Sequence, residues 1–583
     1  MRHNPRLNPR LLGFVTFTAF LSAVVFPNLA LPATELAPAG KPNIVVILTD
    51  DMGSSDLGCY GGEIDTPNID KLASKGVRFT QFYNTARCCP TRASLLTGLY
   101  PHQAGMGWMT GHVSEFPGYS AELSRDAVTI SEALKPAGYS SYMAGKWHIT
   151  SQALPKAEQF NWPRQRGFDR FYGTIMGGGN YSDPAMLTRD DTPITPDNDP
   201  EYKPDNYYYT DAIADQAARF ITEHRDRAGG EKPFFLYVAF TAPHWPLHAP
   251  PETIAKYKGK YDAGYEAIRA KRFERMKSLG VIDKTAELSP APIKWEDVER
   301  KEWEARCMEV YAAQVDRMDQ GVGRVVAALE KTGQLDNTLI LYLHDNGGCA
   351  EKMGRTVHED RAQAAATQPM KPDEIQTVVF PKFTRSGQPV RDGHIVMPGP
   401  ETSFVAYGQG WANVSNTPLR EYKHWVHEGG ITTPLIAHWP AGIARHGAIE
   451  RQPGHLIDVM ATCIEVSGAP YPKEVSGRAI TPMQGVSLAP AFRGESLDRA
   501  RPIFFEHEAN RAVRDGRWKL VAKGITGPWE LYDIDADRSE LHNLASQQPD
   551  RVKTMAGAWQ RWAEASQVLP LNDRSKPASR PAR

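Results

Sequence analysis

The feature that most constrains the fold is a series of short, unbroken apolar segments separated by helical segments. Residues 44–48 (Ile-Val-Val-Ile-Leu) show no alternation of polar and apolar side chains, which is typical of a strand buried on both faces of a sheet. Similar runs follow at 139–143, 234–240, 339–343 and 435–437. Segments with helical periodicity lie between them, among them 210–224 and 303–331. This alternation predicts an α/β fold, with a mostly parallel sheet sandwiched by helices.

The amino-terminal segment has the pattern of a targeting sequence. Arginines precede an apolar run at 11–26, and the small residues Ala30 and Ala33 follow it. This arrangement predicts a signal peptide over 1–33 and an exported protein, either periplasmic or secreted. The alternative is a stable membrane anchor, but the apolar run is short and Pro27 breaks it. We therefore expect no stable membrane anchor.

The pattern changes again toward the carboxyl end. We expect one large domain at 41–495, because the predicted buried strands all lie there. Short strand-like pieces and a helix from about 549 to 566 then predict a smaller C-terminal α+β unit over 496–570, an antiparallel sheet plus a helix. The tail at 571–583 is polar and rich in proline, and is expected to be disordered.

The charge and cysteine content exclude two classes of protein. The formal net charge is -1, and the charged residues form no basic stripe, so no nucleic-acid partner is expected. The six cysteines are scattered and contain no Cys-x-x-Cys pair. The chain is therefore predicted to be neither a disulfide scaffold nor a protein with a structural zinc site.

Unusual polar residues follow the ends of four predicted strands, which is where open α/β sheets bind ligands. They are Asp50 and Asp51 after 44–48, Lys146 and His148 after 139–143, His244 after 234–240, and Asp345 and Asn346 after 339–343.

The acids among these residues predict a metal site. Asp50 and Asp51 would repel each other unless a cation lay between them, and Asp345 and Asn346 could complete its ligands. Three carboxylates and one amide form a hard oxygen set that suits calcium or magnesium better than zinc or copper. Either pair alone could instead form a turn or a helix cap. Their equivalent positions after strands favour the metal.

The segment 87–98 (Arg-Cys-Cys-Pro-Thr-Arg-Ala-Ser-Leu-Leu-Thr-Gly) is the most informative motif. Pro90 suits a first helical turn, so Cys88 is predicted at a helix N-terminus, where free N–H groups favour an anion. Arg92, one turn further on, faces the same end. In isolation, Cys88 could be a plain buried thiol or half of a vicinal disulfide with Cys89.

The Cys-x-Pro-x-Arg pattern, followed by Thr-Gly, resembles the sulfatase family of the alkaline-phosphatase-like fold. Further motifs in family order extend the resemblance over most of the chain after the leader. These are 49–53 (Thr-Asp-Asp-Met-Gly), 145–148 (Gly-Lys-Trp-His), 242–246 (Ala-Pro-His-Trp-Pro), 344–347 (His-Asp-Asn-Gly), and Tyr422-Lys423 with Glu428-Gly-Gly430.

The resemblance implies that a separate formylglycine-generating enzyme oxidises Cys88 to formylglycine, whose hydrate supplies the nucleophile. It also implies one Ca²⁺ ion as a cofactor. The implied calcium ligands are Asp50, Asp51, Asp345, Asn346 and an oxygen of modified residue Cys88.

The resemblance further implies catalytic roles for five residues. Arg92 and Lys146 would steady the formylglycine hydrate. His148 would act as the base that collapses the sulfated intermediate, and His244 with Lys423 would bind the ester and assist the leaving oxygen. These roles make chemical sense, because fixed cations stabilise the negative charge that develops on the leaving oxygen.

The sequence thus predicts an arylsulfatase-type hydrolase of small-molecule or carbohydrate sulfate esters. A phosphatase or phosphonate monoester hydrolase on the same fold is one alternative, and an inactive binder of sulfated glycans is another. The insertion 351–415 is expected to help wall the pocket. His507 and Arg511 are candidates to reach substrate, with surface placement as the default, while further histidines without a matching motif are interpreted as structural: His424, His427 and His438.

Overall fold

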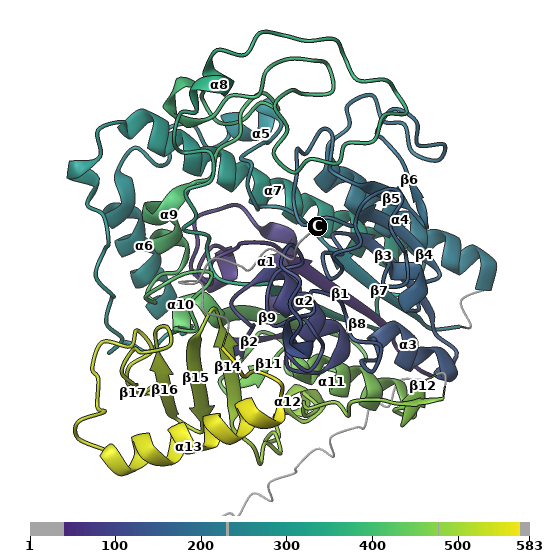
Figure 1. Ribbon diagram of the computed structural model, residues 1–583. Coiled ribbons are helices and arrows are strands. Elements are labelled where there is room, and N and C mark those ends of the chain that lie inside the picture. The colour runs from purple at the N-terminus through teal and green to yellow at the C-terminus, as the bar shows by residue number, and fades with distance from the viewer. Residues whose placement is uncertain (1–39, 229–231, 476, 572–583) are drawn as a thin grey trace, which may run out of the picture. The chain divides into compact units, whose positions relative to one another are not determined.

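The computed structural model describes residues 40–228, 232–475 and 477–571. The predicted signal peptide at 1–33 lies outside these ranges, as does all of the predicted tail except Leu571. Within them, the largest element is an eleven-stranded sheet in the order β10-β2-β9-β8-β1-β7-β3-β4-β5-β6, with β11 beside β2 (Figure 1). Its strands are β1 (Asn43–Thr49), β2 (Val77–Tyr83), β3 (Ser140–Gly145), β4 (Arg170–Thr174), β5 (Leu187–Arg189), β6 (Thr192–Pro193), β7 (Phe234–Ala239), β8 (Thr338–His344), β9 (Thr432–His438), β10 (Ala448–Glu450) and β11 (Gly454–His455).

Strand β1 is the centre of this sheet and is buried on both faces. It pairs in parallel with β7 on one side and with β8 on the other. Because successive side chains of a strand point to opposite faces, Val45 and Ile47 belong to one hydrophobic core, and Ile44, Val46 and Leu48 belong to the other. This two-sided burial explains why its sequence is continuously apolar.

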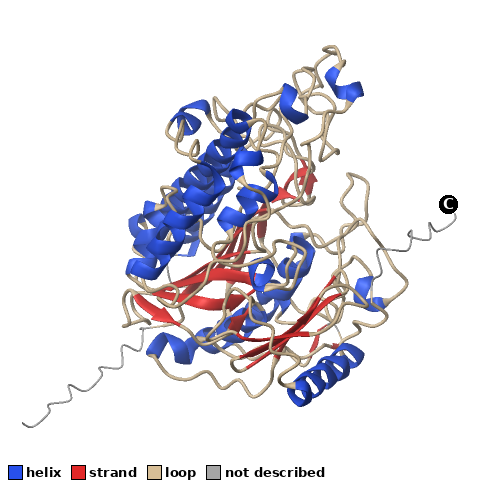
Figure 2. Ribbon diagram, turned by 90° about the vertical axis from the view of Figure 1, so that its left-hand side faces the viewer, coloured by secondary structure: helices blue, strands red, loops and turns tan. Residues whose placement is uncertain are grey.

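Helices cover both faces of the sheet (Figure 2). One core packs against α1 (Pro67–Ser74), α4 (Tyr209–Ala228) and α7 (Lys301–Lys331), and the other against α2 (Cys88–Thr97), α3 (Ile130–Leu134) and α11 (Ile457–Ser467). The remaining helices of the region before the C-terminal sheet are α5 (Pro251–Ala255), α6 (Gly264–Ser278), α8 (Glu359–Ala362), α9 (Gly408–Ser415), α10 (Glu428–Ile431) and α12 (Ala489–Arg493).

The C-terminal region forms a four-stranded antiparallel sheet, drawn in green to yellow in Figure 1. One face packs against the central sheet through Tyr83 and Phe505, and the other packs against the last helix through Leu520 and Trp559. Its elements are β14 (Ile503–His507), β15 (Asn510–Asp515), β16 (Trp518–Ala522), β17 (Glu530–Asp533) and α13 (Pro549–Ala565). A separate short ribbon pairs β12 (Glu474–Val475) with β13 (Arg478–Ala479).

The predicted fold class is confirmed, with an antiparallel contribution from β9. This strand runs antiparallel to β8 and β2, although its apolar run resembles those of the parallel strands. The polar stretch between β8 and Lys423 is largely irregular and contains only short helices. Among the described residues, no helix is both long enough and apolar enough to cross a membrane.

Candidate active site

The ends of four neighbouring strands bring the predicted site residues together. Strands β8, β1, β7 and β3 are adjacent and parallel, so their carboxyl ends lie at one edge of the sheet. Backbone hydrogen bonds fix the segments that follow: the Asp345 N–H donates to the Thr49 carbonyl at 3.0 Å, and the Lys146 N–H donates to the Ala239 carbonyl at 2.9 Å. Predicted residues that are far apart in the sequence therefore share one site.

The acidic residues form a compact, buried group. The backbone N–H of Asp51 donates to Oδ1 of Asp345 at 3.1 Å, and Nδ2 of Asn346 donates to Oδ1 of Asp51 at 2.7 Å. Nη2 of Arg92 lies 3.3 Å from Oδ2 of both Asp50 and Asp345. Two buried oxygens, Oδ1 of Asp50 and Oδ1 of Asn346, have no hydrogen-bond partner among the described residues. Orphaned oxygens beside clustered carboxylates fit a hard divalent cation.

The two carboxyl groups that share Arg92 differ in their proton affinity. Burial raises the pKa of Asp50, but Lys146, His244 and Arg92 outweigh it and hold that pKa at about 2. Burial and the neighbouring negative charge of Asp50 raise the pKa of Asp345 well above its ordinary value. The positive side chains around these two carboxyl groups are therefore too few for both groups to ionise freely. A bound cation would supply the missing positive charge.

Residue 88 is the first residue of α2, as predicted. Arg87 is the N-cap, with extended backbone, and every residue of α2 is buried. Thr91 holds the helix to the acid group, because its Oγ1 donates to the Asp345 carbonyl at 2.6 Å. A hydrogen bond from Cys89 lowers the pKa of the Cys88 thiol well below its usual range, with Lys146 and His148 adding to the effect against the opposing effect of burial. All six cysteines are unpaired, so Cys88 and Cys89 form no vicinal disulfide.

His148 lies beside residue 88 in a constrained position. One ligand atom of each of Cys88, Cys89 and His148 lies within 4.8 Å of the others. The backbone of His148 is left-handed, with φ 57°, and a Cβ on Gly177 would lie 2.0 Å from its Cε1. Burial lowers the pKa of His148 to about 4, so its imidazole is neutral near pH 7 and can accept a proton.

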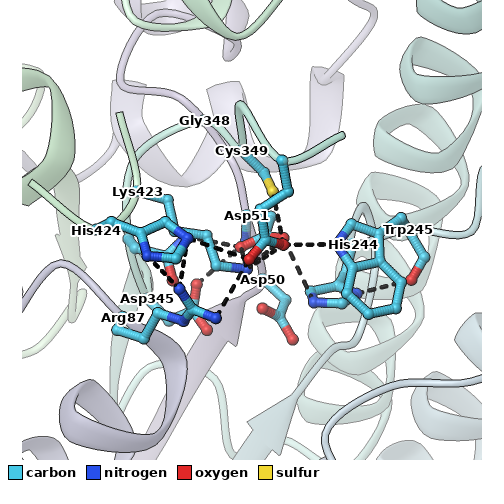
Figure 3. Close-up of polar contacts among 12 residues, drawn as sticks. Asp50, Asp51, Arg87, His244, Trp245, Asp345, Gly348, Cys349, Lys423 and His424 are labelled. Carbon is cyan, nitrogen blue, oxygen red and sulfur yellow. Dashed lines mark hydrogen bonds and ion pairs between the residues drawn. The ribbon is translucent and has the colours of Figure 1, made fainter. Parts of the chain in front are cut away.

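Lys423 and His244 approach the acids from opposite sides, as Figure 3 shows. Nζ of Lys423 lies 2.8 Å from Oδ1 of Asp51, and Nε2 of His244 lies 3.4 Å from Oδ2 of the same residue. Nδ1 of His244 is hydrogen-bonded to the Trp245 carbonyl at 2.7 Å. Lys146 Nζ contacts Asp50. The structure thus brings every predicted site residue into one buried group.

Sequence reasoning missed four residues that lie beside this site and contact one another: Arg87, Glu351, His424 and Glu508. His424, interpreted from the sequence as structural, contacts Oε1 of Glu351 at 3.1 Å and Oε2 of Glu508 at 3.0 Å. For two of them the sequence held a signal, because Arg87 directly precedes Cys88 and His424 directly follows Lys423.

The polar run 506–511 reaches the site through Glu508, and not through the two candidates His507 and Arg511. His507 is fully buried behind Glu508. Arg511 packs over the Trp529 ring, with its Cζ 4.7 Å from the ring centroid, and its Nη2 donates to the Gly527 carbonyl. The turn between the two strands therefore presents Glu508 instead.

Comparisons with known proteins place the chain in a family. A family model described as sulfatase matches residues 42–469, and one described as the C-terminal region of N-sulphoglucosamine sulphohydrolase matches residues 421–564. An uncharacterized sulfatase of Schizosaccharomyces pombe is 33% identical over 569 residues, which cover 92% of this chain and 96% of the relative. An arylsulfatase of Klebsiella aerogenes is 35% identical over 460 residues, which cover 77% of this chain and 91% of the relative.

Solved structures share the fold. The crystal structure of Ps i-CgsB in complex with k-i-k-neocarrahexaose superposes with a TM-score of 0.61 at 25% identity. The superposition covers 91% of this chain and 95% of that one.

Proposed function

The chain belongs to the sulfatase family, and from this premise we propose that it hydrolyses sulfate monoesters through a formylglycine formed from Cys88. The observation that carries the proposal is the position of Cys88. It opens a buried helix, within a Cys-x-Pro-x-Arg motif, between an acid group with orphaned oxygens and a set of fixed cations. A hydrated aldehyde at this position offers one hydroxyl to attack sulfur and a second whose deprotonation releases sulfate.

The surrounding side chains support the individual steps. Lys146 and Arg92 are buried close to residue 88 and hold positive charge against its developing negative charge. His148 is a neutral imidazole within reach of residue 88, so we assign it the removal of the second hydroxyl proton. His244 and Lys423 both contact Asp51, and we place the ester oxygen of the leaving group beside them.

We assign one calcium ion to the acid group. Asp50, Asp51, Asp345 and Asn346, with an oxygen of modified residue 88, would hold it. When bound, the ion supplies positive charge that polarises the nucleophile and the sulfate oxygens. In its absence, Arg92 and Lys146 offset only part of the negative charge, as the raised pKa of Asp345 indicates.

The substrate class follows from the relatives. One relative is named an arylsulfatase, and one structural neighbour is described in complex with k-i-k-neocarrahexaose. We therefore propose aryl or carbohydrate sulfates as substrates, and a formylglycine-generating enzyme as a partner during maturation. Export through the segment 1–33 and the division into 41–495, 496–570 and 571–583 are also part of this proposal.

Parallel assays on an aryl sulfate and the matching aryl phosphate test the proposal. The protein is produced together with a formylglycine-generating enzyme and supplied with calcium. We expect kcat/KM for 4-nitrophenyl sulfate to exceed that for 4-nitrophenyl phosphate by at least about tenfold. A reversed preference would favour a phosphatase. Binding of a sulfated sugar without turnover of any ester, with formylglycine present, would favour a glycan binder.

A further inference from the structure

A mixed group of polar and aromatic side chains, most of them only partly buried, lies beside the site. We call Arg87, Trp108, Glu351, His424 and Glu508 the leaving-group rim. Arg87 directly precedes residue 88, and His424 directly follows Lys423. Oε2 of Glu351 lies 3.4 Å from Nζ of Lys423. The rim therefore adjoins both the proposed nucleophile and Lys423, and on the proposed roles of these residues the leaving group would lie against the rim.

The charges of the rim are already paired with one another. Nη2 of Arg87 lies 3.2 Å from Oε1 of Glu351, and its Nη1 lies 3.7 Å from Oε1 of Glu508. His424 contacts the same two carboxylates. It also contacts Arg87, and Figure 3 shows this contact. One guanidinium thus faces two carboxylates. A second sulfate or a carboxylate on the leaving group would meet cations that are already paired with these carboxylates.

The two carboxylates are ionised hydrogen-bond acceptors. Burial opposes their charge, yet Lys423 and His424 hold the pKa of Glu351 far below its ordinary value. Hydrogen bonds from His424 and His507 do the same for Glu508. Charged acceptors match a ligand that bears hydroxyl groups, because each hydroxyl can donate a hydrogen bond to them.

Two half-buried indoles flank the carboxylates. Nε1 of Trp108 donates to Oε1 of Glu508 at 3.1 Å, and the Trp108 ring stacks on His112 with centroids 4.1 Å apart. Nε1 of Trp245 donates to Oε2 of Glu351 at 2.8 Å. Flat apolar faces beside carboxylates suit a ring that is apolar on its C–H face and polar at its edge, as a sugar is.

The C-terminal sheet delivers Glu508 through a tight turn. Glu508 and Ala509, between β14 and β15, both have left-handed backbone, with φ 51° and 64°. A two-residue hairpin turn of this kind favours Asn and Gly, so these two residues carry strain. Oε1 of Glu506 supports the turn by accepting the Ala509 N–H at 2.7 Å, and Nδ2 of Asn510 donates to the His424 carbonyl at 3.3 Å.

We infer that the leaving-group rim, and Glu508 above all, selects sulfate esters whose leaving group is an uncharged, hydroxyl-bearing ring such as a neutral sugar. This inference rests on the proposed function and narrows it. Glu351 and Glu508 accept the hydroxyls, the indoles cover the ring, and a leaving group with a second anionic substituent is disfavoured.

Steady-state kinetics on three esters test the inference. The calcium-loaded protein with formylglycine is assayed with 4-nitrophenyl sulfate, with glucose 6-sulfate and with a disulfated glucosamine. We expect kcat/KM for glucose 6-sulfate to exceed that for the disulfated sugar by at least about tenfold. Glu508→Gln removes the charged acceptor at nearly constant volume. It should lower kcat/KM for glucose 6-sulfate at least about tenfold more than for the aryl ester.

Two further variants separate recognition from folding. Trp108→Phe keeps an aromatic face but loses the N–H donor to Glu508. It should also lower the ratio of kcat/KM for glucose 6-sulfate to kcat/KM for the aryl ester, by a smaller factor than Glu508→Gln does. Glu495→Gln, at an exposed ion pair with Arg493, should leave kcat/KM unchanged for both esters.

The possible outcomes are distinct. Equal losses on both esters in Glu508→Gln would mean a merely structural role and overturn the inference, as would a preference of the wild type for the disulfated sugar. Both leave the proposed function intact. A formylglycine-containing wild type that hydrolyses none of the three esters would overturn the proposed function and the inference with it.

Discussion

At the scale of single residues, Cys88 occupies a position that stabilises negative charge. It is buried at a helix N-terminus, and the pKa of its thiol lies well below the usual range because of Cys89, Lys146 and His148. A site that favours negative charge on sulfur also favours it on an oxygen nucleophile at the same place. The environment therefore suits chemistry at residue 88 better than core packing.

Replacing the nucleophile tests this interpretation. Cys88→Ala should lower kcat for 4-nitrophenyl sulfate by at least about 10³-fold, since no other group can take the role. The unfolding free energy should change by no more than about 1 kcal/mol, because the substitution removes a single buried sulfur atom. Cys463→Ala, at a buried thiol in α11, is the matched control and should keep its activity. Measurable turnover by Cys88→Ala in assays that detect such a loss would refute the assignment.

At the scale of secondary-structure elements, the acid group connects the ends of β1 and β8. Asp50 and Asp51 follow one strand, and Asp345 and Asn346 follow its parallel neighbour. An ion held between them would link the two segments, and so its binding should stabilise the folded chain.

Calcium removal tests that link. Treatment with a chelator should abolish most activity and lower the thermal midpoint, and calcium should restore both better than zinc does. At a free concentration of about 100 times its Kd, one ion adds about 2.7 kcal/mol to the unfolding free energy. Asp345→Asn should lose most of this calcium-dependent shift, measured by differential scanning calorimetry. Restoration of activity by zinc alone would contradict the hard-ligand argument.

How far the sequence predicts the elements depends on how each one is buried. Strands β1, β7 and β8 are buried on both faces, so their apolar runs identify them and the polar residues after them. Strand β15 carries no such signature, because Asn510 and Arg511 open it with polar side chains inside a polar run. Glu351 and Glu508 could not be assigned to the site, since tertiary packing of an irregular segment and a hairpin turn brings them there. Motif residues were predictable, whereas the rim was not.

At the scale of the whole molecule, a buried charge group joins the C-terminal sheet to the central region. Nζ of Lys519 in β16 lies 2.9 Å from Oε1 of Glu428 and 2.9 Å from Oε1 of Glu540, and all three side chains are fully buried. Arg538 also contacts Glu428, at 3.2 Å. Removal of one partner from such a group leaves a buried charge uncompensated. The C-terminal sheet is therefore fixed in the position that presents Glu508.

Lys519→Met tests this connection. It should lower the unfolding free energy at pH 7 by about 3–5 kcal/mol, measured by urea denaturation. Lys523→Met, at a half-exposed ion pair with Glu421, should cost less than about 1 kcal/mol. A small effect of Lys519→Met would show that the group contributes little to the junction.

The same group predicts a pH dependence of stability. Burial raises the pKa of Glu428, but Lys519, Arg538 and Arg514 lower it from an ordinary 4.5 to about 2. A depressed pKa adds stability that is present above pH 4.5 and is lost as the pH falls toward 2. The wild-type unfolding free energy should therefore decline across this window, and Lys519→Met should decline less steeply. Equal slopes for the two proteins would contradict this assignment.

The most direct test of the central claim is mass spectrometry of residue 88 in active protein. Trypsin cuts after Arg87 and Arg92, so the two adjacent cysteines lie on one peptide, in which Cys89 is an internal control. After alkylation of thiols, we predict an aldehyde at position 88 that reacts with a hydrazide, and an alkylated thiol at position 89. Fully active protein with alkylated thiols at both positions would contradict the account.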